Sequence, residues 1–93
     1  MLTRRLEHRV RSDFWPSEAE TILELLAALQ LPFLERSAEE TERVQAAVVL
    51  LAGGDSRRFL IAAAEAEQDW RDVLVEAGLA EEDWLDRLSA ALG

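Results

Sequence analysis

The sequence predicts an all-α fold, a compact bundle or orthogonal array of four to five short helices. Apolar residues recur every three or four positions through most of the 93-residue chain. Residues typical of helix starts and stops divide these apolar stripes into segments of about ten to sixteen residues. Val48 and Val49 form the only β-branched pair inside an apolar run, and that run has a helical period, so no strand is expected.

Residues 1–12 are expected to form a short basic helix or arm. An apolar stripe that repeats every four residues predicts a helix ending near Ser12. The stripe consists of Leu2, Leu6 and Val10. The segment carries four arginines against Glu7 alone, whereas residues 13–93 hold six arginines against eighteen acids. The four are Arg4, Arg5, Arg9 and Arg11. We therefore expect a basic segment, 1–12, beside an acidic helical domain, 13–93.

The second helix is expected to begin at Ser17. Ser17 and Glu20 form a capping box, in which the serine oxygen accepts a backbone hydrogen bond and the glutamate reaches back to the cap. The helix should stop near Gln30, because Pro32 disfavours helical geometry at Leu31. The predicted buried face is Ile22, Leu25, Leu26 and Leu29.

Two further helices should meet at a glycine-rich turn. Ser37 with Glu40 forms a second capping box, and Gly53 with Gly54 can take the left-handed conformation that ends this third helix. Its predicted apolar stripe is Val44, Ala47, Val48 and Leu51. Asp55 is a natural N-cap, so the fourth helix should begin directly after it.

The fourth helix should reach Gly78, either unbroken or with a break near Gln68. In the second case Asp69 caps a new helical segment. The predicted stripe is Phe59, Ala62 or Ala63, Ala66 and Trp70. A last short helix should begin near Ala80 or Glu81. Its apolar residues are Trp84, Leu85, Leu88 and Leu92.

Composition narrows the classes of function. The chain has no cysteine, tyrosine or lysine. Because cysteine is absent, no disulfide, thiol nucleophile or cysteine-bound metal can form. The single histidine, His8, is expected on the surface. A net charge of −9 repels phosphate backbones, so nucleic-acid binding is not expected. The longest uncharged runs are far shorter than the roughly twenty residues of a membrane span, and no export signal precedes them. We expect a cytoplasmic protein without a cofactor.

Carboxylates are the only abundant reactive groups. If residues 65–76 formed one helix, four acids would lie on a single stripe, and hard cations such as Mg²⁺ prefer oxygen ligands. These acids are Glu65, Asp69, Asp72 and Glu76. The spacings Glu39-x-x-Glu42 and Asp69-x-x-Asp72 resemble the paired motifs of all-α nucleotide pyrophosphohydrolases, which implies a metal-dependent hydrolase as one alternative. The other interpretation is a solvated acidic face.

The string Gly-Gly-Asp-Ser at 53–56 suggests a second alternative function, that of a carrier domain. It resembles the turn of acyl and peptidyl carrier proteins, small acidic helical domains whose serine receives a phosphopantetheine arm. The resemblance implies attachment at Ser56, although Arg57 and Arg58 depart from the family's pattern and a helix runs directly into the motif. A glycine helix stop followed by an aspartate N-cap also accounts for every residue of the string.

The C-terminal third sets tryptophans between paired charges. Trp70 and Trp84 either fasten the last two helices together or form a recognition surface, since tryptophan is enriched at interface hot spots. The candidate partner-binding residues are Trp70, Arg71, Asp72, Asp83 and Trp84, with Arg4, Arg5 and Arg9 of the basic segment.

The stretch from Glu42 to Trp84 resembles a group of short bacterial proteins known only as hypothetical. The resemblance rests on Glu-Arg-Val-Gln-Ala-Ala-Val at 42–48, Gly-Asp at 54–55 and Asp-Trp-Arg-Asp-Val-Leu-Val-x-Ala-Gly-Leu at 69–79. It implies an all-helical fold and a bacterial cytoplasmic setting, and it implies no activity. We therefore expect a small non-enzymatic protein–protein interaction module that binds another protein or associates with itself as a homodimer.

Overall fold

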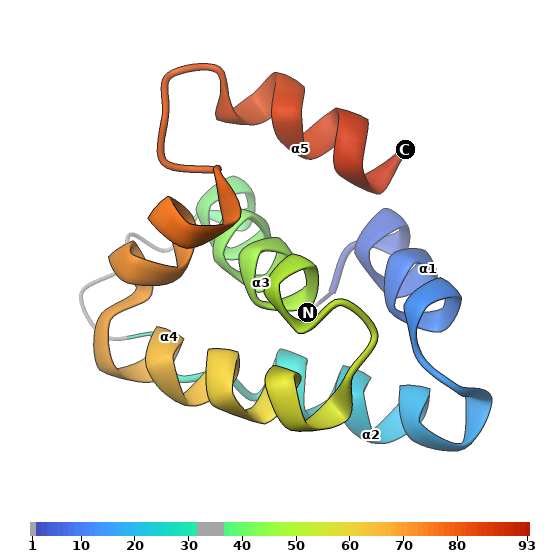
Figure 1. The fold of residues 1–93 in the computed structure, drawn as a ribbon. Coiled ribbons are helices and arrows are strands. Elements are labelled where there is room, and N and C mark those ends of the chain that lie inside the picture. The colour runs from blue at the N-terminus through green and yellow to red at the C-terminus, as the bar shows by residue number, and fades with distance from the viewer. Residues whose placement is uncertain (1, 32–36) are drawn as a thin grey trace.

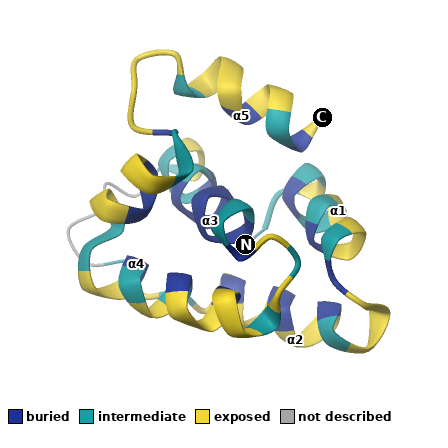
Figure 2. Ribbon diagram, in the orientation of Figure 1, coloured by how far each residue is buried: buried dark blue, intermediate teal, exposed yellow. Residues whose placement is uncertain are grey.

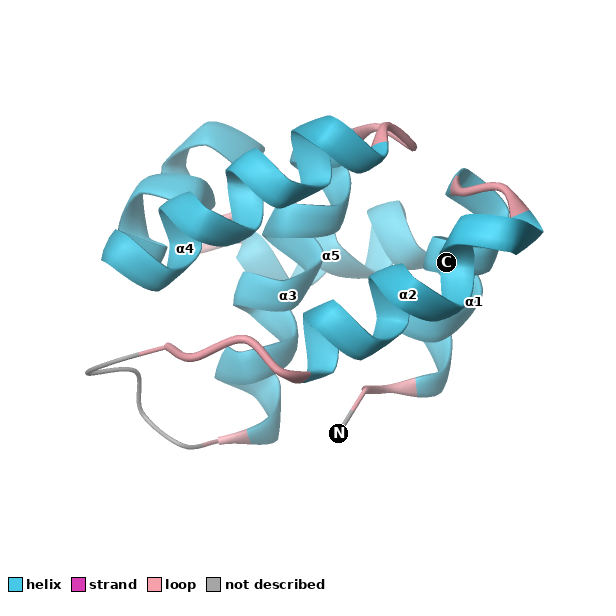
Figure 3. Ribbon diagram, turned by 90° about the horizontal axis from the view of Figure 1, so that it is seen from below, coloured by secondary structure: helices cyan, strands magenta, loops and turns pink. Residues whose placement is uncertain are grey.

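The computed structural model describes residues 2–31 and 37–93, which contain five helices and no strand. The helices are α1 (Arg4–Asp13), α2 (Pro16–Ala27), α3 (Ala38–Ala52), α4 (Ser56–Ala77) and α5 (Trp84–Leu92). In Figure 1, α5 lies above α3 and α1, while α2 and the first part of α4 lie below them. Figure 3 shows the same helices from below. The predicted all-α class of short helices is confirmed.

Helix α3 forms the centre of the core. Six consecutive residues, 44–49, are buried, so α3 is covered on all sides and not only along the predicted stripe (Figure 2). Ala46 and Ala47 are small enough for neighbouring helices to approach closely, and α4 makes the most extensive contact with α3. Leu51, the last residue of the predicted stripe, is only half-buried.

Helix α1 belongs to the same core. Thr3 caps it by accepting a hydrogen bond from the Leu6 N–H, and the helix ends at Asp13, one residue beyond the predicted end. Leu6 and Val10 are fully buried, whereas Leu2 is half-buried at the edge. The basic segment therefore lies on the acidic body of its own chain as a packed helix.

Helix α2 corrects the predicted capping box. It begins at Pro16, with Trp15 as an N-cap that makes no side-chain hydrogen bond, so Ser17 lies within the first turn. Proline favours the first helical position because its φ is already helical and its missing N–H is not needed there. The helix ends at Ala27, earlier than Gln30. Leu25, predicted to be buried, is 40% exposed. The buried residues are Ala19, Ile22, Leu23 and Leu26.

The second predicted box is half confirmed. Ser37 caps α3 by accepting a hydrogen bond from the Glu40 N–H at 3.1 Å. The Glu40 carboxylate pairs instead with Arg43 at 3.2 Å, because an arginine one turn further along offers it a charged partner.

Helix α4 is kinked at Asp69, whose φ of −153° and ψ of 99° are not helical. The Asp69 carboxylate accepts a hydrogen bond from the Arg71 N–H at 3.1 Å and so caps the residues that follow. Of the two predicted alternatives, the break is therefore confirmed. We call residues 56–68 the first limb of α4 and residues 70–77 its second limb. Gly78, at a φ of 77°, ends the helix, and α5 begins only at Trp84.

The turn between α3 and α4 has the predicted structural form. Gly53 adopts the left-handed conformation at the end of α3, with a φ of 56°. Asp55 caps α4 by accepting hydrogen bonds from the Arg57 and Arg58 N–H groups. Gly54 lies against the end of α1, where a Cβ would come within 2.6 Å of the Asp13 carbonyl oxygen. The glycines and the aspartate thus place the start of α4 against α1.

Candidate functional site

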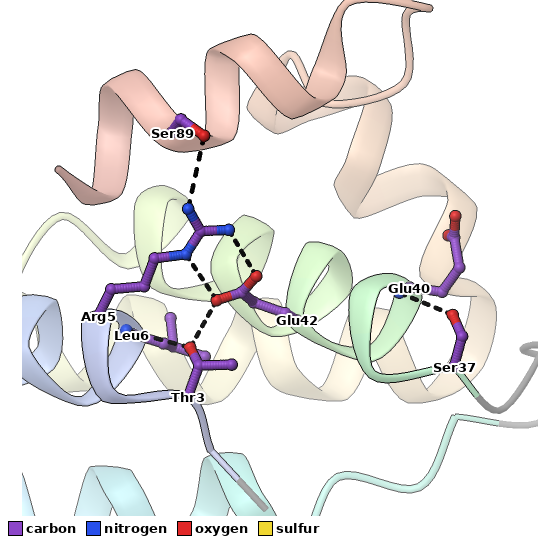
Figure 4. Close-up of polar contacts among 7 residues, drawn as sticks. All are labelled: Thr3, Arg5, Leu6, Ser37, Glu40, Glu42 and Ser89. Carbon is purple, nitrogen blue, oxygen red and sulfur yellow. Dashed lines mark hydrogen bonds and ion pairs between the residues drawn. The ribbon is translucent and has the colours of Figure 1, made fainter.

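Arg5, one of the predicted partner-binding arginines, joins three parts of the fold. Its guanidinium donates two hydrogen bonds to the Glu42 carboxylate, at 2.9 and 2.7 Å, and a longer one to Ser89 in α5 (Figure 4). Thr3 donates to the same carboxylate. The hydrogen bonds from Arg5 hold the pKa of Glu42 below its ordinary value, against the opposing effect of burial. This arginine therefore links α1, α3 and α5.

The other two predicted arginines of α1 have different surroundings. Arg9 pairs with Asp13 at 2.9 Å and donates to the carbonyl oxygen of Ala91, near the end of α5. Arg4 is exposed to solvent. Arg5 and Arg9 thus fasten α5 to the body of the protein, and Arg4 alone of the three is exposed.

The predicted C-terminal residues lie at two places in the structure, beside the kink of α4 and at the start of α5. Trp84 is half-buried beneath the Arg43 guanidinium, whose central carbon lies 4.5 Å from the ring centroid. The same guanidinium donates to the Leu79 carbonyl oxygen at 2.8 Å, and Asp83 pairs with Arg87. Arg43 of α3 therefore secures the loop before α5 together with its first residue, a contact that the sequence pattern did not reveal.

The remaining C-terminal residues lie beside the kink. Trp70 is half-buried at the start of the second limb, with the Arg71 guanidinium 5.7 Å from its ring centroid. Arg71 pairs with Asp69, and both side chains are well exposed to solvent, so this ion pair contributes little to stability. Asp72 is exposed.

The kink overturns the geometry expected for the acidic stripe. Asp69 turns toward Arg71 and caps the second limb, so residues 65–76 do not form one helix. Glu65 and Glu76 nevertheless come together across the kink: burial, the Glu76 carboxylate and the charge of Asp72 together raise the pKa of Glu65. Within residues 2–31 and 37–93, no group of three or more acids or histidines is placed to hold a metal ion.

Ser56, the predicted carrier attachment site, has a buried hydroxyl. Its Oγ has no hydrogen-bond partner, and the residue lines a hollow of about 250 Å³ between α2 and α4. Transfer of a phosphopantetheine arm requires the hydroxyl to reach the transferase. In this structure the Ser56 hydroxyl is not accessible to a transferase.

We expect Ser56→Ala to raise the free energy of unfolding by about 1 kcal/mol, because it removes a buried hydroxyl that has no partner. Urea denaturation followed by circular dichroism measures the change. Ser17→Ala is the matched control, since Ser17 is exposed in the first turn of α2 and should change stability by less than about 0.5 kcal/mol. A marked loss of stability in Ser56→Ala would contradict this prediction, because it would show that the hydroxyl makes a stabilising hydrogen bond.

The first limb of α4 exposes a mixed apolar and basic surface, which we call the α4 face. Its members are Arg57, Arg58, Leu60, Ile61 and Ala64, all of them exposed. Leu60 and Ile61 are consecutive large apolar residues with exposed fractions of 55% and 62%. They lie off the buried line of Phe59, Ala62 and Ala66, so helical geometry turns them toward solvent.

A hollow borders the α4 face on each side. The hollow toward α2 is lined by Leu60 together with Ile22 and Leu25. The hollow on the other side, about 180 Å³, is lined by Arg58, Ile61 and Glu65, with Leu51 of α3 and Glu76 of the second limb. The α4 face therefore forms a ridge between two depressions, each lined by apolar and polar residues.

Helical periodicity did not reveal this surface. The stripe of Phe59, Ala62 and Ala66 identifies the buried side of α4 but does not show how far its other sides are covered. The sequence holds only a partial signal, since Leu60 and Ile61 are large apolar residues outside this stripe, and their exposure depends on which helices lie beside α4.

No protein-family model, curated protein or solved structure matches the chain. In the part of the chain that the structure describes, no helix is both long and apolar enough to cross a membrane. The resemblance to short bacterial proteins stays a prediction.

Proposed function

We propose that this protein is a non-enzymatic interaction module that binds protein through the α4 face. The observation that carries the proposal is the exposure of Leu60 and Ile61 side by side on one helix, between two hollows. Exposed apolar residues that stand singly are ordinary, but a contiguous group rimmed by polar residues is typical of a binding surface.

The energetics of burial support this surface. Full burial of a leucine or isoleucine side chain contributes about 1.5–3 kcal/mol, and each of these two is a little more than half exposed, so covering both would contribute roughly 2–3 kcal/mol. The two hollows give a partner depressions into which its own side chains can pack. Val75 and Leu85 are also exposed, but they lie on different helical segments.

The placement of the predicted partner-binding residues also favours the α4 face. Arg5, Arg9 and Trp84 make contacts that hold helices of the same chain together. The polar groups of the two arginines are already engaged within the chain. Leu60 and Ile61 can bind without any rearrangement of the fold.

Site-specific photocrosslinking in the cells that produce the protein tests the proposal. With a benzophenone amino acid in place of Leu60, we expect a covalent adduct to a polypeptide. The same group in place of Leu85, which is 51% exposed on α5 at the opposite side of the molecule, should give none (Figure 1). Adding Ile61→Arg should abolish the adduct at position 60. Absence of an adduct at position 60, or equal labelling at both positions, would contradict the proposed function.

A further inference from the structure

We propose that the partner of the α4 face is a second copy of this chain, packed antiparallel so that Arg58 of each copy pairs with Glu65 of the other. The proposal rests on the function proposed above and specifies the partner. It follows from the distribution of charge along the first limb, which has arginines in its first turn and glutamates in its last turns.

The register of the helix makes the surface self-complementary. Arg58 lies three residues before Ile61 and Glu65 lies four residues after it, so both occupy the same flank of Ile61, two turns apart. In an antiparallel pair of helices, residues on the same flank face each other. A two-fold axis beside Ile61 therefore places Arg58 of one copy opposite Glu65 of the other, and the symmetry makes the pair twice.

The unpaired charges of the single chain favour this arrangement. Within residues 2–31 and 37–93, Arg58 makes no ion pair. Glu65 lies beside the carboxylates of Glu76 and Asp72, and within the same residues it makes no ion pair with an arginine. An incoming guanidinium could form the direct ion pair that Glu65 lacks within its own chain.

The apolar part of the α4 face fits the same symmetry. Ile61 lies beside the axis and would contact Ile61 of the second copy. Ala64, one turn further along, is small enough to let the two helices approach closely. Because each copy carries a net charge of −9, long-range repulsion opposes the pair and lowers the affinity of the dimer.

Sedimentation velocity of the full chain over a concentration series tests the pairing with charge exchange. We expect the unaltered protein to dimerise, and Arg58→Glu or Glu65→Arg alone to weaken dimerisation by about tenfold or more, because each places like charges opposite each other. An equimolar mixture of the two variants should form a heterodimer, since each glutamate then faces an arginine. The double variant should dimerise as the unaltered chain does.

Arg58 is exposed and Glu65 is half-exposed, so neither substitution should disturb the core. Circular dichroism verifies the helix content of every variant. Ile61→Arg provides an independent disruption of the pairing, with Leu85→Arg on α5 as its matched control, which should dimerise normally. A protein that stays monomeric at all concentrations, or a mixture that associates no better than its components, would overturn the pairing. If photocrosslinking at position 60 then yields a different polypeptide, the proposed function stands and only the identity of the partner is wrong.

Discussion

Gly54→Ala should lower the free energy of unfolding by about 3 kcal/mol or more, whereas Gly53→Ala should lower it by about 1 kcal/mol. Both glycines have positive φ values, of 82° and 56°, so both substitutions place an L-residue in an unfavourable conformation. They differ in their surroundings. A Cβ on Gly54 would lie 2.6 Å from the Asp13 carbonyl oxygen, and a Cβ on Gly53 meets nothing within 4 Å.

The difference between the two variants isolates the close approach of α1 to the turn that precedes α4. Because the obstructing atom belongs to the backbone, relief requires movement of a whole segment and not of one side chain. Urea denaturation of both variants measures this difference in unfolding free energy. Equal losses of stability in the two variants would show that backbone conformation alone, and not the contact with Asp13, makes glycine necessary at position 54.

The second large effect is expected for Glu42→Ala, which should lower the free energy of unfolding by about 2–3 kcal/mol. The Glu42 side chain is 8% exposed, and its removal leaves the Arg5 guanidinium and the Thr3 hydroxyl without the acceptor they share. Removing one member of a fully buried ion pair costs about 3–5 kcal/mol, and the loss is smaller here because Arg5 is 34% exposed. Replacing both Arg5 and Glu42 by methionine should recover much of the lost stability, because no uncompensated charge then remains.

The same ion pair predicts how stability depends on pH. The pKa of Glu42 is lowered in the folded state from its ordinary value of 4.5. Its contribution is therefore complete above about pH 4.5, where the carboxylate is ionised in both states, and is lost as the pH falls through the lowered pKa. The difference in unfolding free energy between the unaltered chain and Glu42→Gln should shrink as the pH falls below about 4.5. A constant difference across that range would contradict the role given to the ionised carboxylate.

These contacts explain how an acidic chain retains a basic first helix. Arg5 and Arg9 bind a carboxylate or a carbonyl oxygen on another helix, and Arg43 does the same for the loop before α5. Helix α5 has only two buried residues, Leu88 and Leu92. Arginine contacts from α1 and α3 therefore supplement a small apolar contact in holding the last helix in place.

Local sequence signals predicted the helix boundaries best where the controlling contact lies within one turn. Ser37 and Asp55 cap their helices through backbone groups two or three residues away, and Gly53 and Gly78 end helices through their own backbone conformation. The alternative of a break capped by Asp69 could be stated in advance for the same reason. The box at Ser17 failed because Pro16, its neighbour, is a stronger signal for a helix start.

Packing between distant segments determined the ion pairs between helices and the burial of helix faces, which sequence patterns did not predict. Glu42 is 37 residues from Arg5, and an acid in the first turns of a helix reads as solvent-exposed until α1 and α5 are placed against it. Periodicity identifies one apolar side of a helix, but the burial of α3 on every side and the exposure of Leu25, Leu60 and Ile61 depend on which helices lie beside them. Helix boundaries are set by backbone groups within a few residues, whereas the covered and uncovered faces follow from contacts that exist only once all five helices have packed.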